Sequence, residues 1–524
     1  MRPLLLLLLA ALAPTVALAA PRDPDHRPTC HTPEMLRHRF EEEGGPAYSG
    51  PNMTRPAEAG YVDSTIYPLR IHYRNADDAD RAATVVLPIA EDVWHTEIEV
   101  MGWPQPPTDY GVGGSDSYDI YLTNDQTQGG AYTYTTYDSG IEPDTNPNDN
   151  FFSNSSWIAV DDDQSWIPDS LMSLFVSHEF NHACQYAIDA NESTVFVWES
   201  TAEAISEIYS GLSSDYTSEI PSFQSHPNLS ILFSAYDRQV STYGNETGYY
   251  EYGGWIFGAF IEQAFGANDG TELLQMWTDL ATGSKSDEPD FVDALGLIGG
   301  ADFPDAGQLF LDFSEWRLMV AKFDDGAHYS DAAHWGKSSE VGLEGTLTLS
   351  AVDGTALTPV NPPYYLGDSV WEIDVDAAST GTLHLDVTGD STTQWGIVAA
   401  GYPASGAAIV AKARGADGEE VATDLALTGV TKILVAVANV GPSTLDPEDS
   451  NIGHTNNFTL TLSVISDANA DSGTVDSTPL DTGAEKTKAG GCACATNENT
   501  GLTGLSLGGL FMAAGVVAGR RRQR

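Results

Sequence analysis

Apolar and polar positions alternate along the first half of the chain in a way that predicts both strands and helices. Short alternating runs predict strands at residues 69–73, 118–122, 131–137 and 157–160. Apolar positions at helical spacing, from Val86 to Trp94, predict a helix that ends at Gly102, with Pro104 beyond it. Strands interleaved with helices over residues 61–335 predict an α+β domain.

The pattern changes after about residue 340. Gly, Thr and Val become frequent, and short alternating runs predict further strands at residues 345–349, 369–375, 382–387, 432–437 and 458–464. Successive short strands without intervening helices are typical of a β-sandwich. We therefore expect an all-β sandwich domain over residues 340–465.

A second predicted helix contains the candidate metal ligands and the candidate catalytic base. Leu171, Leu174 and Phe175 run at helical spacing toward the sequence His-Glu-Phe-Asn-His at 178–182. His178 and His182 lie one turn apart on the same face, a spacing that suits two ligands of one metal ion. Catalytic zinc sites leave one position for a water, whose pKa falls to roughly 7. Glu179 can take a proton from that water and pass it to a leaving amine, which predicts hydrolysis of amide bonds.

A third predicted helix contains two glutamates one turn apart, Glu199 and Glu203. Residues 199–203, Glu-Ser-Thr-Ala-Glu, resemble the Asn-Glu-Gly-x-Ala-Glu segment of gluzincin metallopeptidases, although Ser200 stands where glycine is usual. The resemblance implies a zincin-like metallopeptidase domain that binds one catalytic Zn²⁺, with Glu199 as the third ligand. It also implies that Glu203 orients a zinc-binding histidine. The alternative for Glu203 is an ordinary solvated acid on a helix.

Residues 250–253, Tyr-Glu-Tyr-Gly, are similar to the Tyr-Glu-Lys-Gly segment of the aminopeptidase branch of the same clan. In that branch the tyrosine hydroxyl stabilises the oxyanion, a contribution of about 3 kcal/mol. Tyr250 is the first choice for this role and Tyr252 the second. Both tyrosines can instead simply pack the start of a helix.

Two further features concern the substrate. The Gly-x-Met-Glu-Asn motif with which aminopeptidases bind a free amine is absent, so an endopeptidase is favoured. Residues 129–133 are the candidate edge strand to which an extended peptide would add.

Four cysteines occur, and two of them belong to the C-terminal tail. Cys30 lies in residues 20–60, an N-terminal extension or propeptide, and Cys184 follows the zinc motif. In an oxidising compartment the two can form a disulfide. The other interpretation is a propeptide switch in which Cys30 caps the zinc.

The ends of the chain predict export. Residues 1–19 have a basic start, an apolar run and an Ala-Leu-Ala cleavage site that ends at Ala19, as in a secretory signal peptide. Residues 466–491 predict a flexible linker, followed at 492–524 by a segment with Cys492, an apolar run at 502–519 and an arginine cluster. This segment resembles the myxobacterial C-terminal sorting segment, which implies membrane insertion, cleavage near Cys492 by a sorting protease, and display on the outer membrane or release. A permanent single-pass anchor is the alternative.

Composition narrows the range of partners. The chain holds 75 acidic and 23 basic residues, a formal net charge of −52. Nucleic acid is excluded as a partner because its binding requires a basic patch. Asp161, Asp162 and Asp163 are a candidate Ca²⁺ site, with a solvated acidic loop as the alternative.

Together these features predict a secreted or surface-displayed zinc endopeptidase that acts on proteins or peptides. The rival from another class is a catalytically silent surface binding or adhesion protein on a zincin scaffold. Glu179 argues against that rival, because a structural zinc site needs no base beside it.

Overall fold

The computed structural model describes Cys30, Thr32 and most of the chain from residue 55 to residue 466. The described ranges are 55–124, 127, 130–135, 153–164, 167–190, 192–211, 217–281, 290–298, 305–376, 379–442 and 454–466. The predicted signal peptide with Ala19, the linker and the sorting segment with Cys492 lie outside these residues. Within the described ranges, no helix combines the length and apolar character that crossing a membrane requires.

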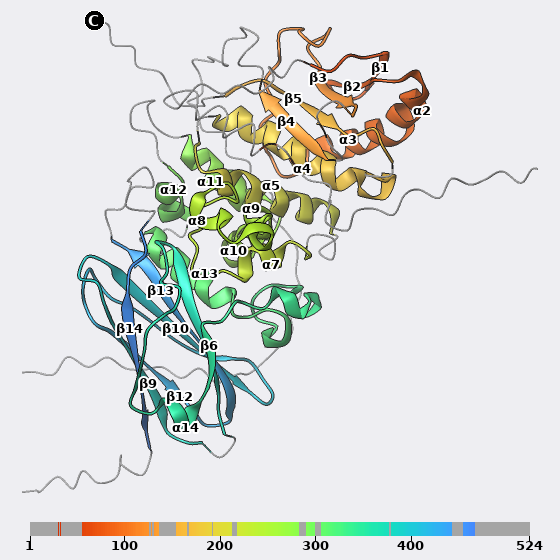
Figure 1. Ribbon diagram of the computed structural model, residues 1–524. Helices are drawn as coiled ribbons and strands as arrows, with labels where there is room; N and C mark the ends of the chain where they lie inside the picture. The colour runs from red at the N-terminus through yellow and green to blue at the C-terminus, as the bar shows by residue number, and fades with distance from the viewer. Residues whose placement is uncertain are drawn as a thin grey trace, which may run out of the picture. The chain divides into compact units, whose positions relative to one another are not determined.

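Helices and one mixed sheet come first along the chain, and an all-β region follows, as the sequence predicts (Figure 1). The first sheet has the order β1-β2-β3-β5-β4, with β2, β3 and β5 parallel and the two outer strands antiparallel to their neighbours. Its strands are β1 (Gly60–Asp63), β2 (Leu69–Tyr73), β3 (Tyr118–Leu122), β4 (Ala131–Thr135) and β5 (Ser156–Val160). Because β4 lies at an edge, the described part of the predicted edge strand is confirmed.

Two long helices follow the sheet. α4 (Asp169–Ile188) begins after Pro168, whose fixed backbone suits a helix start, and packs against β4, β5 and α3 (Leu87–Trp94). On its other side it packs against α5 (Val195–Ser210). From Val176 to Ile188 every residue of α4 is buried. A helix that is covered all round is a core helix, and this burial removes its histidines from bulk water.

Shorter helical segments precede and follow these two along the chain. The helical run before β3 comprises η1 (Ala76–Asp78), α2 (Ala79–Arg81), η2 (Ala82–Val86), α3 and η3 (His95–Val100). After α5 come α7 (Ile220–Gln224), α8 (Arg238–Ser241), η5 (Gly244–Thr247), α9 (Tyr250–Gly253), α10 (Trp255–Phe265), α11 (Thr271–Leu280), α12 (Phe291–Ile298), α13 (Ala306–Trp316), η7 (Ala321–Phe323), η8 (Ala332–His334) and η9 (Lys337–Ser339). α9 and α10 both pack on α5.

The β region contains two sheets, ordered β11-β10-β13-β8-β6 and β12-β9-β14-β7, that share one apolar core. Its elements are β6 (Gly345–Thr348), α14 (Leu349–Val352), β7 (Thr355–Leu357), β8 (Gly367–Asp374), β9 (Thr382–Gly389), β10 (Gln394–Pro403), β11 (Ile409–Arg414), β12 (Val421–Ala426), β13 (Val430–Gly441) and β14 (Phe458–Ile465). The opposite face of the first of these sheets joins the core of the helical region, because α13 packs on β10 and β13.

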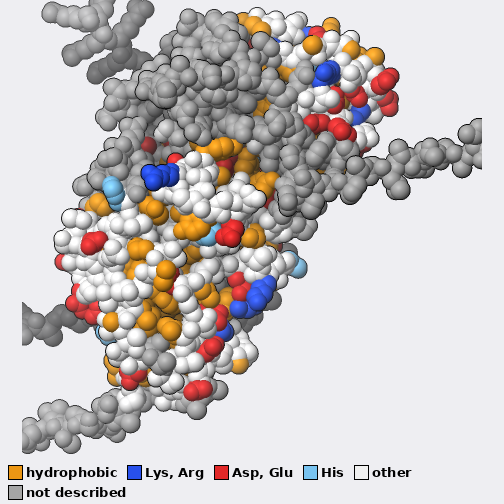
Figure 2. Space-filling model, viewed as in Figure 1, with side chains coloured by type: hydrophobic (Ala, Val, Ile, Leu, Met, Phe, Trp, Pro, Cys, Tyr) orange, Lys and Arg blue, Asp and Glu red, His pale blue; other side chains and the backbone are white. Residues whose placement is uncertain are grey.

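The acidic composition is visible at the surface. On the face shown in Figure 2, red acidic side chains gather at the upper right, over the part of Figure 1 that contains β1, β2 and α2. Buried carboxylates are a separate group that includes Glu179, Glu199 and Glu203. These three lie together at the junction of α4 and α5.

Candidate metal centre

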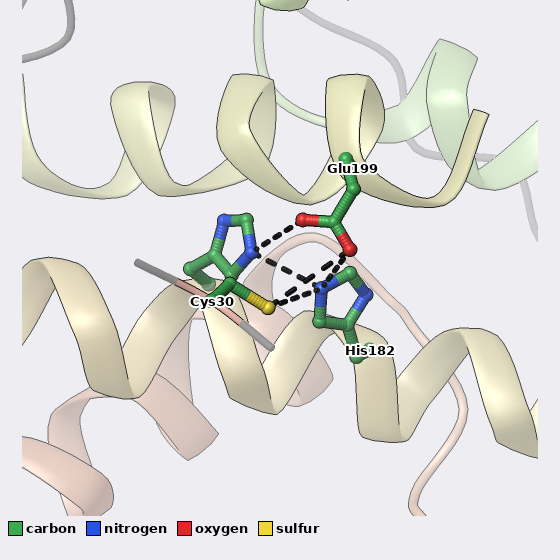
Figure 3. Close-up of side chains that lie close together, drawn as sticks. Cys30, His182 and Glu199 are labelled. Carbon is green, nitrogen blue, oxygen red and sulfur yellow. Dashed lines mark hydrogen bonds and ion pairs between the residues drawn. The ribbon is translucent and has the colours of Figure 1, made fainter. Parts of the chain in front are cut away.

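α4 and α5 bring the three predicted zinc ligands together. His178 and His182 point from α4 with their Nε2 atoms 3.1 Å apart. Glu199 reaches over from α5, with Oε2 at 3.2 Å from His178 Nε2 and Oε1 at 3.3 Å from His182 Nε2. Figure 3 shows the carboxylate of Glu199 pointing toward His182 from the facing helix. One turn of helix and one interhelical contact therefore produce a three-donor site.

Cys30 supplies a fourth donor. Its Sγ lies 3.7 Å from His182 Nε2 and 3.9 Å from Glu199 Oε1, and Figure 3 shows it pointing into the same space. The four donor atoms all lie within 4.8 Å of one another, and all four residues are buried. In the part of the chain that the structure describes, this is the one group of such residues with the geometry to hold a metal ion.

The spacing of the donors fits a tetrahedral ion. At zinc–nitrogen and zinc–oxygen distances of about 2.05 Å, two tetrahedral ligands lie about 3.3 Å apart, and a thiolate sulfur at about 2.3 Å lies about 3.6 Å from a nitrogen. The two Nε2 atoms lie 3.1 Å apart, and each lies 3.2 or 3.3 Å from a different oxygen of Glu199. The sulfur lies 3.7 Å from His182 Nε2 and 3.9 Å from Glu199 Oε1, so the separations are close to the tetrahedral values and slightly longer on the sulfur side. A mixed set of imidazole, carboxylate and thiolate is chemistry that zinc accepts.

The electrostatics of the site also favour a cation. Burial raises the pKa of Glu199, but the two imidazoles outweigh it and hold the pKa at about 2. Burial lowers the pKa of His178, yet Glu203 and then Cys30 raise it well above its usual range. Burial, Glu179 and Glu199 together raise the pKa of the Cys30 thiol. A divalent cation placed among these groups would stabilise the carboxylate and deprotonate the thiol.

A polar side chain contacts the Nδ1 atom of each of the two histidines. Glu203, from α5, places Oε2 at 2.6 Å from His178 Nδ1, and it is 3 % exposed rather than solvated. Gln185, one turn beyond His182 on α4, places Oε1 at 2.7 Å from His182 Nδ1. The Gln185 oxygen accepts from His182 Nδ1, which leaves Nε2 of that ring to bind a metal. The Glu203 carboxylate lies at ion-pair distance from His178 Nδ1, an atom that forms no hydrogen bond among the described residues, while His178 Nε2 faces the other donors. Gln185 was not among the residues predicted from the sequence, although its place three residues after His182 was the available signal.

Glu179 lies beside the four donors and is fully buried. Its Oε2 accepts hydrogen bonds from Thr133 Oγ1 at 2.8 Å and from Thr32 Oγ1 at 3.2 Å. Its Oε1 is buried and has no hydrogen-bond partner among the described residues. A buried carboxylate oxygen without a donor is costly, so Oε1 is ready to accept a hydrogen bond from a water or a substrate group that enters the site.

The hydroxyl groups of the two candidate tyrosines lie in different places, one in the core and one at the candidate metal centre. Tyr250 donates its hydroxyl to the carbonyl of Ser230 at 3.0 Å, inside the core, and the structure does not bring it to the metal centre. The Tyr252 hydroxyl donates to the carbonyl of Cys30 at 2.7 Å, and the Tyr252 ring lies 6.3 Å from the ring of His178. The order of preference is thus reversed, and Tyr252 is the tyrosine at the site.

The predicted disulfide is wrong. Cys30 and Cys184 are both free and buried, with Cys30 at the metal centre and Cys184 in the apolar core on another face of α4. The two cysteines lie on different sides of the helix because Cys184 is only two positions, or about half a turn, past His182.

The acidic run after β5 does not form a second ligand group among the described residues. Asp161 is buried and accepts from Thr127 Oγ1 at 2.6 Å. Burial and the neighbouring Asp78 and Asp161 raise the pKa of Asp162 to about 6. The candidate Ca²⁺ site therefore remains a sequence-based prediction.

Comparison with family models finds no match for this chain, and comparison with curated proteins finds none either. Two solved structures with partial likeness are the pre-peptidase C-terminal domain of a collagenase from Bacillus anthracis and a surface-associated copper-binding protein from Methylomicrobium album BG8. The first is 12 % identical, covers 23 % of this chain and 95 % of its own, and has a TM-score of 0.15. The second is 8 % identical, covers 24 % and 98 %, and has a TM-score of 0.18. Likeness at this level carries no argument about fold or activity.

Proposed function

We propose that this chain is a zinc-dependent peptidase of gluzincin type that hydrolyses internal peptide bonds of proteins or peptides. The observation that carries the proposal is a buried donor set at tetrahedral spacing, His178, His182 and Glu199, with the unpartnered Oε1 of Glu179 beside it. A ligand set alone is compatible with a structural site. The adjacent carboxylate is what a hydrolytic site requires.

Each nearby group has a role in this reaction. Bound zinc would acidify a water and polarise the carbonyl of the substrate. Glu179 takes the proton from the water and delivers it to the leaving amine, while Thr133 holds the Glu179 carboxylate in place. Tyr252 donates to the developing oxyanion. Glu203 and Gln185 hold the two imidazoles in their metal-binding tautomer.

The substrate backbone would bind along β4. This strand lies at a sheet edge and packs against α4, so a peptide added to it would pass close to Glu179. The first region would then be zincin-like in its finer architecture, and the β region a sandwich. The predicted signal peptide and sorting segment support export to the outer membrane or the medium, with insertion in the membrane before a sorting protease acts.

One observation favours a second candidate function. Cys30 closes the fourth position, and four protein ligands are typical of structural zinc. A catalytically silent surface adhesion or binding protein, with a purely structural zinc, would have such a site. This candidate leaves the buried, unpartnered oxygen of Glu179 without a purpose.

Metal content and hydrolysis of casein separate the two candidates. Because Cys30 occupies a ligand position, both the wild-type chain and the Cys30→Ser variant are assayed. We expect about one zinc per chain, lost on substitution of His178, His182 or Glu199 by alanine. Full zinc content and full activity in Glu199→Ala would show that the third ligand is misassigned.

The base is tested by Glu179→Gln in the Cys30→Ser chain. Glutamine keeps the size of the side chain but cannot accept the proton, so zinc content should stay unchanged while hydrolysis falls on the order of 10²-fold or more. Glu246→Gln, at an exposed acid away from the site, is the matched control. Equal activity in the two variants would remove Glu179 from the mechanism.

A further inference from the structure

We propose that Cys30 and Thr32 form a built-in inhibitor, which blocks the candidate metal centre with the Cys30 thiolate as fourth metal ligand until the chain is cut between Thr32 and Arg55. This inference rests on the proposed peptidase function and concerns the regulation of the same site. It follows from contacts that two residues make with four separate functional groups.

Cys30 makes three of these contacts. Its Sγ points at the donors of His182 and Glu199, and its backbone forms a parallel bridge with Ala131 of the edge strand β4. Its carbonyl accepts the hydrogen bond from Tyr252 at 2.7 Å. One residue therefore occupies the metal position, as Figure 3 shows, and also contacts the edge of the sheet and the proposed oxyanion donor.

Thr32 makes the fourth contact. Its hydroxyl donates to Glu179 Oε2 at 3.2 Å and accepts from the backbone N–H of Thr133 at 3.0 Å. Thr32 is fully buried. The base is thus engaged by the same segment, and a substrate cannot reach β4, Tyr252 or Glu179 while Cys30 and Thr32 remain in place.

The segment inhibits and is not itself cleaved, because it presents a sulfur atom, and not a carbonyl carbon, to the metal position. A substrate must place a carbonyl carbon between the metal and Glu179, with its oxygen polarised. This segment presents a sulfur to the donor cluster, while the Cys30 carbonyl is directed to Tyr252. A thiolate on zinc leaves no position for the attacking water.

Covalent attachment keeps the inhibitor bound. Arg55, further along the chain, forms ion pairs with Asp109 at 2.5 Å and with Asp119 on the sheet. Cys30 is therefore tethered close to its site at a high effective concentration. Hydrolysis of one peptide bond between Thr32 and Arg55 removes this advantage. Once released, the Cys30 sulfur would take a proton from solvent, and a water could then take its place among the metal ligands.

Cobalt substitution tests the coordination directly. Co²⁺ bound by a thiolate shows a sulfur-to-metal charge-transfer band that imidazole and carboxylate ligands lack. We expect this band in the full-length chain with Co²⁺, its loss in Cys30→Ser, and its retention in Cys184→Ser, where the thiol lies in the core. A full-length wild-type spectrum without the band would overturn the proposal.

Alkylation gives a second readout that does not depend on activity. With zinc bound, Cys30 should resist iodoacetamide, and removal of the metal by a chelator should expose it. Equal labelling rates with and without zinc would contradict coordination by Cys30. This measurement uses wild-type protein, so it remains valid if a cysteine variant fails to fold.

Release is tested in a full-length chain with a site for a specific protease inserted between Gly44 and Gly45. Cleavage after folding should remove the cobalt band and raise peptide hydrolysis on the order of 10²-fold. Uncut Cys30→Ser should already be active, uncut Cys184→Ser should remain latent, and uncut Thr32→Val should lie between them. Thr32→Val frees Glu179 but leaves the sulfur in place.

The outcomes distinguish the two proposals. Equal activity in cut, uncut and Cys30→Ser chains would overturn the inhibitor and leave the peptidase standing. Zinc retained in every form, with a cysteine-dependent band that persists after cleavage and no hydrolysis of any peptide, would overturn both and establish a structural site.

Discussion

At the scale of single residues, orientation of the imidazoles decides whether two histidines one turn apart can bind one ion. Glu203 and Gln185 each contact an Nδ1, so both Nε2 atoms face the same point. Gln185 is itself held, since the two N–H groups of its Nε2 have three acceptors within hydrogen-bonding distance: Asn181 Oδ1, the carbonyl of Trp198 and Thr201 Oγ1. This one amide therefore links the orientation of His182 to the position of α5.

Loss of the carboxylate behind His178 should weaken metal binding. We expect Glu203→Ala to lower zinc affinity about 10- to 100-fold, because an outer partner fixes the tautomer and basicity of its ligand. Competition with a chromophoric chelator measures the affinity. Glu207→Ala, one turn further along α5, is the control for loss of an acid on the same helix, and an equal effect in both variants would contradict the assigned role.

At the scale of elements, the site depends on how closely α5 is pressed against α4. Ser177 Oγ and Ser206 Oγ lie 2.7 Å apart between the two helices. α10 supports α5 from behind, where Gly258 meets the turn that carries Ser200 and Ala204. A Cβ atom at position 258 would lie 2.7 Å from Ala204 Cβ and 3.2 Å from the Ser200 carbonyl. Glycine is thus required by this close approach.

Gly258→Ala should therefore destabilise the protein and weaken the metal site together. Overpacking of this kind costs about 1–3 kcal/mol, and displacement of the Ser200 turn moves the adjacent Glu199. Chemical denaturation and zinc titration measure the two effects. Adding Ala204→Gly removes the atom at 2.7 Å, so the double variant should recover zinc affinity even where stability stays below wild type. Failure to recover it would mean that the clash does not act through α5.

At the scale of the whole described part, a buried ion pair joins the helical region to the β region. Arg317 Nη1, just beyond α13, lies 3.1 Å from Asp368 Oδ2 on β8, and both side chains are almost fully buried. Asp368 also accepts from Ser314 Oγ at 2.8 Å, and Arg317 donates to Gln224 Oε1 at 2.9 Å. Burial raises the pKa of Asp368 to about 6, although Arg317 acts to lower it.

Because the folded-state pKa of Asp368 is raised, its contribution to stability is present at low pH and is lost as pH rises through about 6. Arg317→Met removes the counter-charge and raises this pKa further. We expect a loss of about 3–5 kcal/mol at pH 8, where the carboxylate is buried unpaired, and a smaller loss at pH 5, where it can be protonated. Urea denaturation at both pH values measures this. Asp368→Asn added to Arg317→Met should abolish the difference between the two pH values, and a persisting difference would assign it to other groups.

Much of the site could be predicted from the sequence because its information is local. The spacing of His178 and His182 is set by one helical turn, and Glu199 with Glu203 belongs to a second helix of the same kind. Strands β2 and β3 have the predicted bounds, because their apolar residues alternate as in a pleated strand, although almost every residue of both strands is buried. β10 escaped prediction because Trp395 and Ile397 face one core while Val398 and Ala400 face the other, which leaves no alternation to detect.

The sequence by itself determined which histidines and which glutamate gather at the candidate metal centre, and the order of the structural regions. Only the tertiary structure decided between Tyr250 and Tyr252, two positions apart on one short helix, because packing alone sets which hydroxyl lies beside Cys30 and the candidate metal centre. It also decided that Cys30 lies at the metal centre and not in a disulfide with Cys184. Cys30 and His182 are 152 positions apart. A contact at that separation depends on how the intervening chain folds back, which no local spacing encodes.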